Sequence, residues 1–191
     1  MTTINRRTLL YSFGLASVSA LLPAQTPVTG KVSVANPGEG RFTFSTVQQA
    51  RLSTCKLTGE DTAGTLSIFE LSALTQSGPY RHVHHREDEW YYVLSGEFLF
   101  KAGDESHILL PGASIWLPRG IPHVWANTSS SEARILLVCQ PGGFEKFFEE
   151  MGSSMARVDS ATAQSKMKEV MAKYGMELLG PPLLKPLREQ H

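Results

Sequence analysis

The sequence has little of what several common classes of protein require. Two cysteines in 191 residues cannot support a disulfide-rich fold or a zinc site built on thiolates. Eighteen Lys and Arg balance eighteen Asp and Glu, so the electrostatic attraction that drives nucleic-acid binding is missing. After the N-terminal segment no run of 18 apolar residues occurs, and we expect no membrane span in the mature chain. The 41% hydrophobic and 19% charged residues are typical of one globular domain.

Residues 1–24 resemble a bacterial export signal. Arg6 and Arg7 precede a moderately apolar, serine-containing stretch that ends near small residues suitable for cleavage. The arginine pair indicates the twin-arginine route, with an ordinary secretory signal or a retained anchor as alternatives. We therefore expect an exported protein, periplasmic or secreted, in which residues 25–40 form an extended leader.

Residues 41–140 consist of short β-like runs separated by Gly, Pro, Asn and Asp. Many short strands at regular spacing are typical of a sandwich or small barrel. The ten expected strands are 42–46, 52–57, 65–74, 80–84, 89–94, 97–101, 106–110, 114–117, 123–127 and 134–139.

From residue 141 onward the hydrophobic period becomes helical. Asp159 suits the N-cap of a second helix and Gly175 its end. The sequence thus predicts two C-terminal helices within 141–191, followed by a proline-rich tail without regular structure that starts at Gly180. The apolar stripes, which we expect to pack against the barrel, are Phe144, Phe147, Phe148 and Met151, then Met167, Val170, Met171 and Tyr174.

The stretch from His82 to Glu89 carries the strongest chemical signal. Residues two apart on a strand face the same side, so His82 and His84 project into one space whereas His85 faces the other. After a turn, Glu89 begins the next strand. Two imidazoles opposite a carboxylate are a suitable donor set for a first-row transition metal.

His123 is the fourth candidate ligand. It follows a segment rich in Gly and Pro, whose turns can direct its imidazole toward the first pair. Three imidazoles and one carboxylate leave coordination positions open, as catalytic metal sites do. Glu87 and Asp88 are the alternatives to Glu89 if the intervening turn is shorter than expected.

Both motifs resemble those of the cupin family. The first family motif is HxH, three or four residues, Glu, six residues, Gly, and the matching residues here are His82, His84, Glu89 and Gly96. The second is G, five residues, PxG, two residues, H, three residues, N, and the matching residues are Gly112, Pro118, Gly120, His123 and Asn127. The family's leading glycine is replaced by Gln76, with Gly78 two residues later, which puts the local turn in doubt.

This resemblance implies a mainly all-β fold, an antiparallel jelly-roll β-barrel of six to eight strands, with the C-terminal helical extension added. It implies one divalent transition metal inside the barrel: iron, manganese, cobalt, nickel, copper or zinc. The implied metal ligands are His82, His84, Glu89 and His123. Cupins commonly form homodimers through edge strands, and the segment 25–46 is the candidate for such pairing.

The segments around Phe144 and Tyr174 are similar to the extension of single-domain bacterial cupins likened to quercetin 2,3-dioxygenase. This implies a dioxygenase that uses O2 and a flavonol-like or other enolisable, hydroxylated aromatic substrate. Glu89 would then also be catalytic, because it would accept the proton of the substrate hydroxyl. The alternatives are a metal-dependent isomerase or decarboxylase of a small acid or sugar, and a non-enzymatic small-molecule binder.

Other residues are expected to have a supporting role. The strand parity of Tyr91, Val93 and Trp125 lets them line the substrate cavity, or simply pack in the barrel. His85 is expected to meet solvent or a partner, and His107 to form a surface or core polar pair. Asn127 is expected to fix backbone, and the two cysteines, Cys55 and Cys139, to be buried apolar residues whose pairing in an oxidising compartment stays open.

Overall fold

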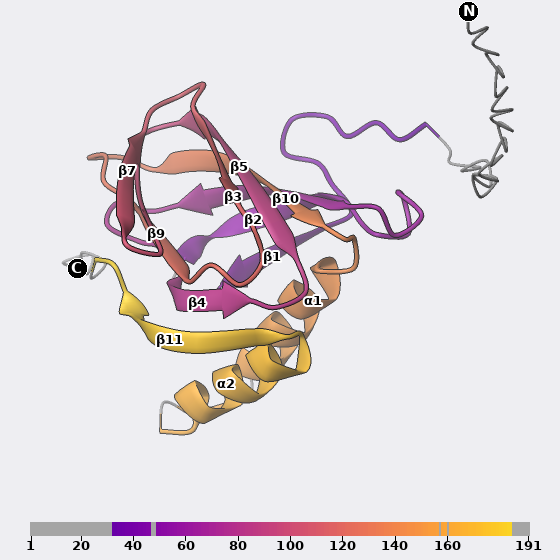
Figure 1. Cartoon of the computed structure of the whole chain (residues 1–191). Coiled ribbons are helices and arrows are strands. Elements are labelled where there is room, and N and C mark those ends of the chain that lie inside the picture. The colour runs from indigo at the N-terminus through magenta and orange to yellow at the C-terminus, as the bar shows by residue number, and fades with distance from the viewer. Residues whose placement is uncertain (1–31, 47–48, 157, 160, 185–191) are drawn as a thin grey trace, which may run out of the picture.

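A computed structural model describes residues 32–46, 49–156, 158–159 and 161–184 (Figure 1). The predicted export signal and the first part of the leader lie outside the described residues. All ten strands expected from the sequence are present, with ends that differ by at most a few residues. They are β1 Phe42–Thr46, β2 Gln49–Leu57, β3 Ser67–Ala73, β4 Tyr80–His84, β5 Asp88–Ser95, β6 Phe98–Ala102, β7 Glu105–Leu109, β8 Ser114–Leu117, β9 His123–Asn127 and β10 Ala133–Gln140.

The strands form two antiparallel sheets. One has the order β1-β2-β3-β10-β5-β8, and the other has the order β11-β4-β9-β6-β7, where β11 is Met176–Pro182. The eight strands from β3 to β10 supply four strands to each sheet, as in a jelly roll. β1 and β2 extend the first sheet and β11 extends the second. The predicted antiparallel jelly roll is therefore confirmed.

Alternating side chains fill the interior between the sheets. Along β5 the buried residues are Glu89, Tyr91 and Val93, and the residues between them are part-exposed. β3 and β10 alternate in the same way and contribute Phe69 and Leu137 to the core. Because side chains on a strand alternate strictly, this pattern carries the carboxylate of Glu89 into an otherwise apolar interior.

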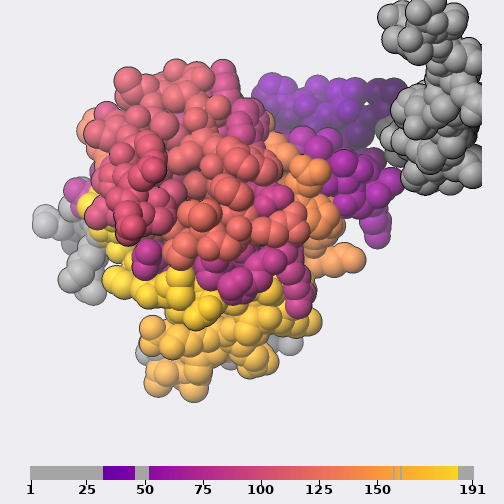
Figure 2. Space-filling view, in the orientation of Figure 1, coloured from indigo at the N-terminus to yellow at the C-terminus, as the bar shows by residue number. Residues whose placement is uncertain are grey.

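Two helices cover one side of the barrel, α1 Glu145–Met155 and α2 Ala163–Lys173. Figure 1 shows both helices beneath the sheets, and Figure 2 shows the same C-terminal segment, in orange and yellow, packed against the barrel. No helix in the described part of the chain is long and apolar enough to cross a membrane. The buried side of these helices contains Phe147, Phe148 and Met151, then Met167, Val170 and Met171, as the stripes predicted.

The start of α2 differs from the prediction. Its N-cap is Thr162, not Asp159. The Oδ1 atom of Asp159 instead accepts hydrogen bonds from the backbone N–H groups of Ala161 and Thr162, at 3.0 and 2.9 Å. Asp159 therefore caps the turn that leads into the helix and not the helix itself. Aspartate side chains accept backbone hydrogen bonds in both positions.

The end of the chain also differs from the prediction. Gly180 to Pro182, expected to have no regular structure, belong to β11, which pairs antiparallel with β4. Irregularities in register near Gly180 accommodate the two prolines. Prolines are tolerated here because β11 is an edge strand, whose outer backbone groups need no partner strand.

The turn before β4 explains the departure from the family motif. Gln76 has φ +58°, in the left-handed region that favours glycine. Its N–H donates to the carbonyl of Asn127 at 2.9 Å, so the turn is held against β9. A Cβ at Gly78 would lie 1.9 Å from the carbonyl oxygen of Trp125. The turn thus accepts a glutamine, whereas the close approach to β9 requires Gly78.

Candidate metal centre and cavity

The four predicted ligands meet inside the barrel. His82 and His84 come from β4, His123 from β9, and Glu89 from β5 in the opposite sheet. One donor atom of each lies within 4.8 Å of those of the others, and all four side chains are buried. His82 and His123 are paired residues of neighbouring strands, which brings them together although they are distant in sequence.

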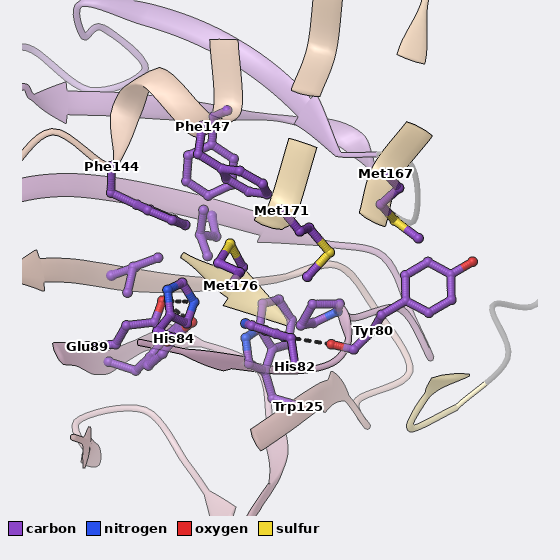
Figure 3. Close-up of a pocket in the computed structure, with 15 residues that line it drawn as sticks. Tyr80, His82, His84, Glu89, Trp125, Phe144, Phe147, Met167, Met171 and Met176 are labelled. Atoms are coloured by element: carbon purple, nitrogen blue, oxygen red, sulfur yellow. Dashed lines mark hydrogen bonds and ion pairs between the residues drawn. The ribbon is translucent and has the colours of Figure 1, made fainter. Parts of the chain in front are cut away.

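Backbone carbonyls orient two of the imidazoles. Nδ1 of His82 lies 2.6 Å from the carbonyl oxygen of Tyr80, a contact drawn in Figure 3. Nδ1 of His123 lies 3.0 Å from the carbonyl oxygen of Ile121. Since a carbonyl can only accept a hydrogen bond, each Nδ1 carries a proton, and in the neutral ring the free lone pair is on Nε2. This tautomer is the one that binds a metal through Nε2.

Several polar atoms of the cluster are buried without a well-aligned hydrogen bond. They are Nε2 of His84, Nε2 of His123 and Oε2 of Glu89. The Glu89 oxygens lie 3.4 Å from Nε2 of His84 and 2.9 Å from Nε2 of His123. Such atoms are costly to bury unless something binds them. A divalent metal satisfies all of them, so the residues present fit the metal that the motifs imply.

The electrostatics of the cluster favour an ionised Glu89 beside a neutral His82. Burial alone raises the pKa of Glu89, but the charge of His84 and the contact with His123 outweigh burial and lower that pKa to about 2. Burial holds the pKa of His82 well below its usual value. Burial also lowers the pKa of His123, but the Glu89 carboxylate outweighs it and the net pKa is raised. Glu89 is thus ionised and His82 neutral at pH 7, the forms that bind a cation.

The two alternatives to Glu89 lie outside the cluster. Asp88 forms a bidentate ion pair with Arg119, at 2.7 and 3.0 Å. Oε2 of Glu87 lies 3.4 Å from Nδ1 of His84. Glu87 therefore orients a ligand from behind and does not belong to the donor set.

Replacing Glu87 with glutamine should weaken metal binding about 10-fold, the low end of the ~10–100-fold effects of such outer contacts. A small effect is expected because 3.4 Å is a long contact. A competitive titration against a chelator measures it. Glu105→Gln is the matched control, since Glu105 faces His107 at 3.1 Å outside the cluster. Equal affinities for Glu87→Gln and the control would remove the orienting role.

An apolar cavity of about 90 Å³ adjoins the metal cluster. His82, His84 and Glu89 form one wall, so an ion held by the cluster would face this space. No Lys or Arg is found among the described residues that line it. The wall contributed by the C-terminal extension consists of Phe144, Phe147, Phe148, Met167, Met171 and Met176, most of them labelled in Figure 3.

The three barrel residues considered for the cavity are placed differently. Tyr91 and Trp125 line it. Val93, two residues beyond Tyr91 on β5, is 1% exposed in the hydrophobic core and is not a lining residue. The hydroxyl of Tyr91 donates to Oε1 of Glu89 at 3.3 Å. Burial raises the pKa of Tyr91 well above its usual value, so this hydroxyl keeps its proton.

The C-terminal wall is the part of the site that sequence reasoning missed. The stripes of α1 and α2 were assigned to core packing, and their residues do pack in the core. Several of them, including Phe147 and Met171, also line the cavity. Helical spacing shows which residues share a face of the helix. Packing in the core and lining a cavity both require an apolar face, so the sequence does not distinguish a packing residue from a lining residue.

His85, His107 and Asn127 lie outside the cluster, whereas Sγ of Cys139 lies 3.9 Å from Oε1 of Glu89. His85 and His107 have side chains that are 54% and 42% exposed, and each faces a glutamate. Asn127 donates to two backbone carbonyls at 3.0 and 2.8 Å and so fixes the chain, as expected. Cys55 and Cys139 are both buried and free.

Comparisons with known proteins agree with this fold. Residues 68–139 match the family described as a cupin domain. Protein SchB of Streptomyces halstedii is 32% identical over 82 residues, 42% of this chain and 59% of that protein. The chain thus spans about three-fifths of the length of the curated relative that it matches.

Similar solved structures include TT1209 from Thermus thermophilus, with 33% identity, 41% of this chain and 74% of that chain covered, and a TM-score of 0.39. Another is the polyketide cyclase RemF from Streptomyces resistomycificus, with 20% identity, 58% and 80% covered, and a TM-score of 0.49. The specific similarity to quercetin 2,3-dioxygenase stays a prediction. The two histidine motifs, the jelly-roll topology and the family match identify residues 68–139 of this chain as a cupin domain.

Proposed function

We propose that the protein is a metal-dependent dioxygenase that acts on a flavonol-like or other enolisable, hydroxylated aromatic compound. The observation that carries this proposal is a His3Glu cluster beside an apolar cavity whose described lining has no cationic side chain. Aromatic rings enter such a space favourably. A sugar phosphate or a small di-acid would find no cationic side chain in this lining besides the metal itself, which disfavours these substrates.

The chemistry divides between the ion and the side chains. A bound divalent metal would act as a Lewis acid and lower the pKa of a coordinated substrate hydroxyl. His82, His84 and His123 would hold that ion as neutral ligands. Glu89 is ionised and can accept the substrate proton, while the Tyr91 hydroxyl, 3.3 Å from Oε1, orients its carboxylate. Both atoms of O2 would enter the product, so no further reductant is required.

Metal reloading with substrate panels tests this proposal. Apoprotein is loaded in turn with iron, manganese, cobalt, nickel, copper or zinc, and O2 uptake is recorded with 3-hydroxyflavone and hydroxylated flavonols. We expect one O2 consumed per flavonol lost with at least one metal, and no uptake by the apoprotein. Glu89→Gln should lose this uptake because it cannot accept the proton.

The other outcomes identify the alternatives. Conversion of a small acid or sugar without O2 uptake would indicate an isomerase or decarboxylase. Tight ligand binding without turnover under any metal would indicate a carrier. Either result would contradict the dioxygenase.

We also propose export by the twin-arginine route and a homodimer formed through edge strands. The support for export is the Arg6-Arg7 pair before an apolar stretch. Within the segment 25–46, β1 pairs with β2 on one side and forms the edge of its sheet, so its outer side could accept a partner strand. N-terminal sequencing of the exported protein and light scattering test these two proposals.

A further inference from the structure

The cavity opens to solvent at one end. Among its lining residues, Pro79 and Tyr80 are part-exposed and all the others are buried. Figure 3 shows the ring of Tyr80 near Met167, at the end of the cavity away from Glu89 and His84. A ligand that approaches the metal cluster would therefore pass Tyr80.

Tyr80 also lines a groove outside the cavity. This groove has a volume of about 300 Å³. Its other walls are Gln164 and Lys168 of α2 and the end of β11, residues 178–181. Gln164 and Lys168 are four residues apart, so they share one face of the helix. The side chain of Tyr80 thus borders both the cavity and the groove.

The cavity alone is small for an aromatic ligand. Its volume is about 90 Å³, whereas pockets for small molecules span ~300–1,000 Å³. Met167, Met171 and Met176 line it, and unbranched methionine side chains rearrange readily to admit a ring. A ligand with several rings would still extend past Tyr80 into the groove.

Lys168 supplies the charge of the groove. It is exposed, and its ammonium group forms no hydrogen bond or ion pair with the described part of the chain. By contrast, Lys166 and Lys173 of the same helix pair with Glu169 and Glu150. An ammonium group without such a partner can donate to an oxygen anion of a ligand.

We propose that this groove is an outer subsite in which Tyr80, Gln164 and Lys168 receive the anionic end of an elongated aromatic substrate. The ring system lies in the cavity, where contacts are apolar, and the far end is recognised by charge. A small acid is too short to use both parts. The inference rests on the proposed function, because it concerns the same ligand.

Binding without oxygen tests the subsite separately from turnover. The probes are 3-hydroxyflavone and its 4′-carboxylate, whose charge lies far from the hydroxy-ketone edge. Anaerobic fluorescence titration of the metal-loaded protein should show the carboxylate probe bound about 5–10-fold more tightly, as for one charged hydrogen bond near the surface. Added salt should reduce this preference.

Lys168→Ala should abolish the preference and leave binding of 3-hydroxyflavone unchanged. Lys168 is exposed, so its replacement should not disturb folding. Lys166→Ala is the matched control, since Lys166 belongs to the same helix but does not line the groove. Tyr80→Trp, which narrows the passage, should slow association of both probes in stopped-flow experiments.

Two results would overturn the subsite: equal affinity of the wild-type protein for both probes, or a preference that survives in Lys168→Ala. O2 uptake recorded in parallel separates the two proposals. Uptake without a carboxylate preference would refute the subsite and leave the dioxygenase. A preference that depends on Lys168, without uptake, would support the subsite and refute the dioxygenase.

Discussion

Alanine in place of His123 should abolish stoichiometric metal binding and all metal-dependent activity. His123 supplies one of four clustered donors and is the residue whose Nε2 lies 2.9 Å from Glu89. Its loss removes a metal ligand. It also removes one of the groups that offset the charge of the buried Glu89 carboxylate. We expect metal affinity to fall by more than about 100-fold, beyond the range of outer contacts. Elemental analysis and chelator competition measure the change.

His107→Ala is the matched control. His107 lies on β7 with its side chain 42% exposed and outside the cluster, so its removal should leave metal content unchanged. Thermal unfolding of both apoproteins checks that each variant folds. If folded His123→Ala retained one tightly bound metal per chain, the four residues would not be the metal site.

Glu145→Ala should destabilise the protein by about 3 kcal/mol, because two buried donors lose their acceptor and a third, the N–H of Gly143, keeps only the hydroxyl oxygen of Ser67. Glu145 begins α1 and is 4% exposed. Its carboxylate accepts the N–H of Gly59 at 3.1 Å, the hydroxyl of Ser67 at 2.6 Å and the N–H of Gly143 at 3.1 Å. These hydrogen bonds link three segments of the chain: the loop after β2, the start of β3 and the turn before α1.

Urea unfolding at pH 7 measures this loss. Glu149→Ala, an exposed glutamate of the same helix, should change the free energy of unfolding by less than about 0.5 kcal/mol. Glu145→Gln keeps one carbonyl acceptor but turns an amide donor toward the remaining donors, so an intermediate loss is expected. A free energy of unfolding for Glu145→Ala equal to that of the control would show that this network contributes nothing.

Local patterns in the sequence predict much of the barrel. Turn-forming Gly and Pro residues locate the strands by marking where they end. The observed ends of β1, β4, β8 and β9 are those expected. Strand parity alone places His82 and His84 on one side and His85 on the other. These features depend on a few neighbouring residues, since backbone sterics and the alternation of side chains act locally.

Other features depended on contacts between distant segments. The pairing of His82 with His123 follows from the register between β4 and β9. The tail became β11 because the edge of β4 was available to it, in spite of two prolines. The wall of Phe and Met side chains forms where α1 and α2 cover the barrel.

Residue types and spacing therefore determined the strands, their facing sides and the four donor atoms. The tertiary structure decided which strands are neighbours, what covers the cavity and where the cavity opens. The physical reason is that burial of apolar surface is non-directional: a helical stripe specifies that a face will be covered, and only the packing of the whole chain specifies what that face will meet.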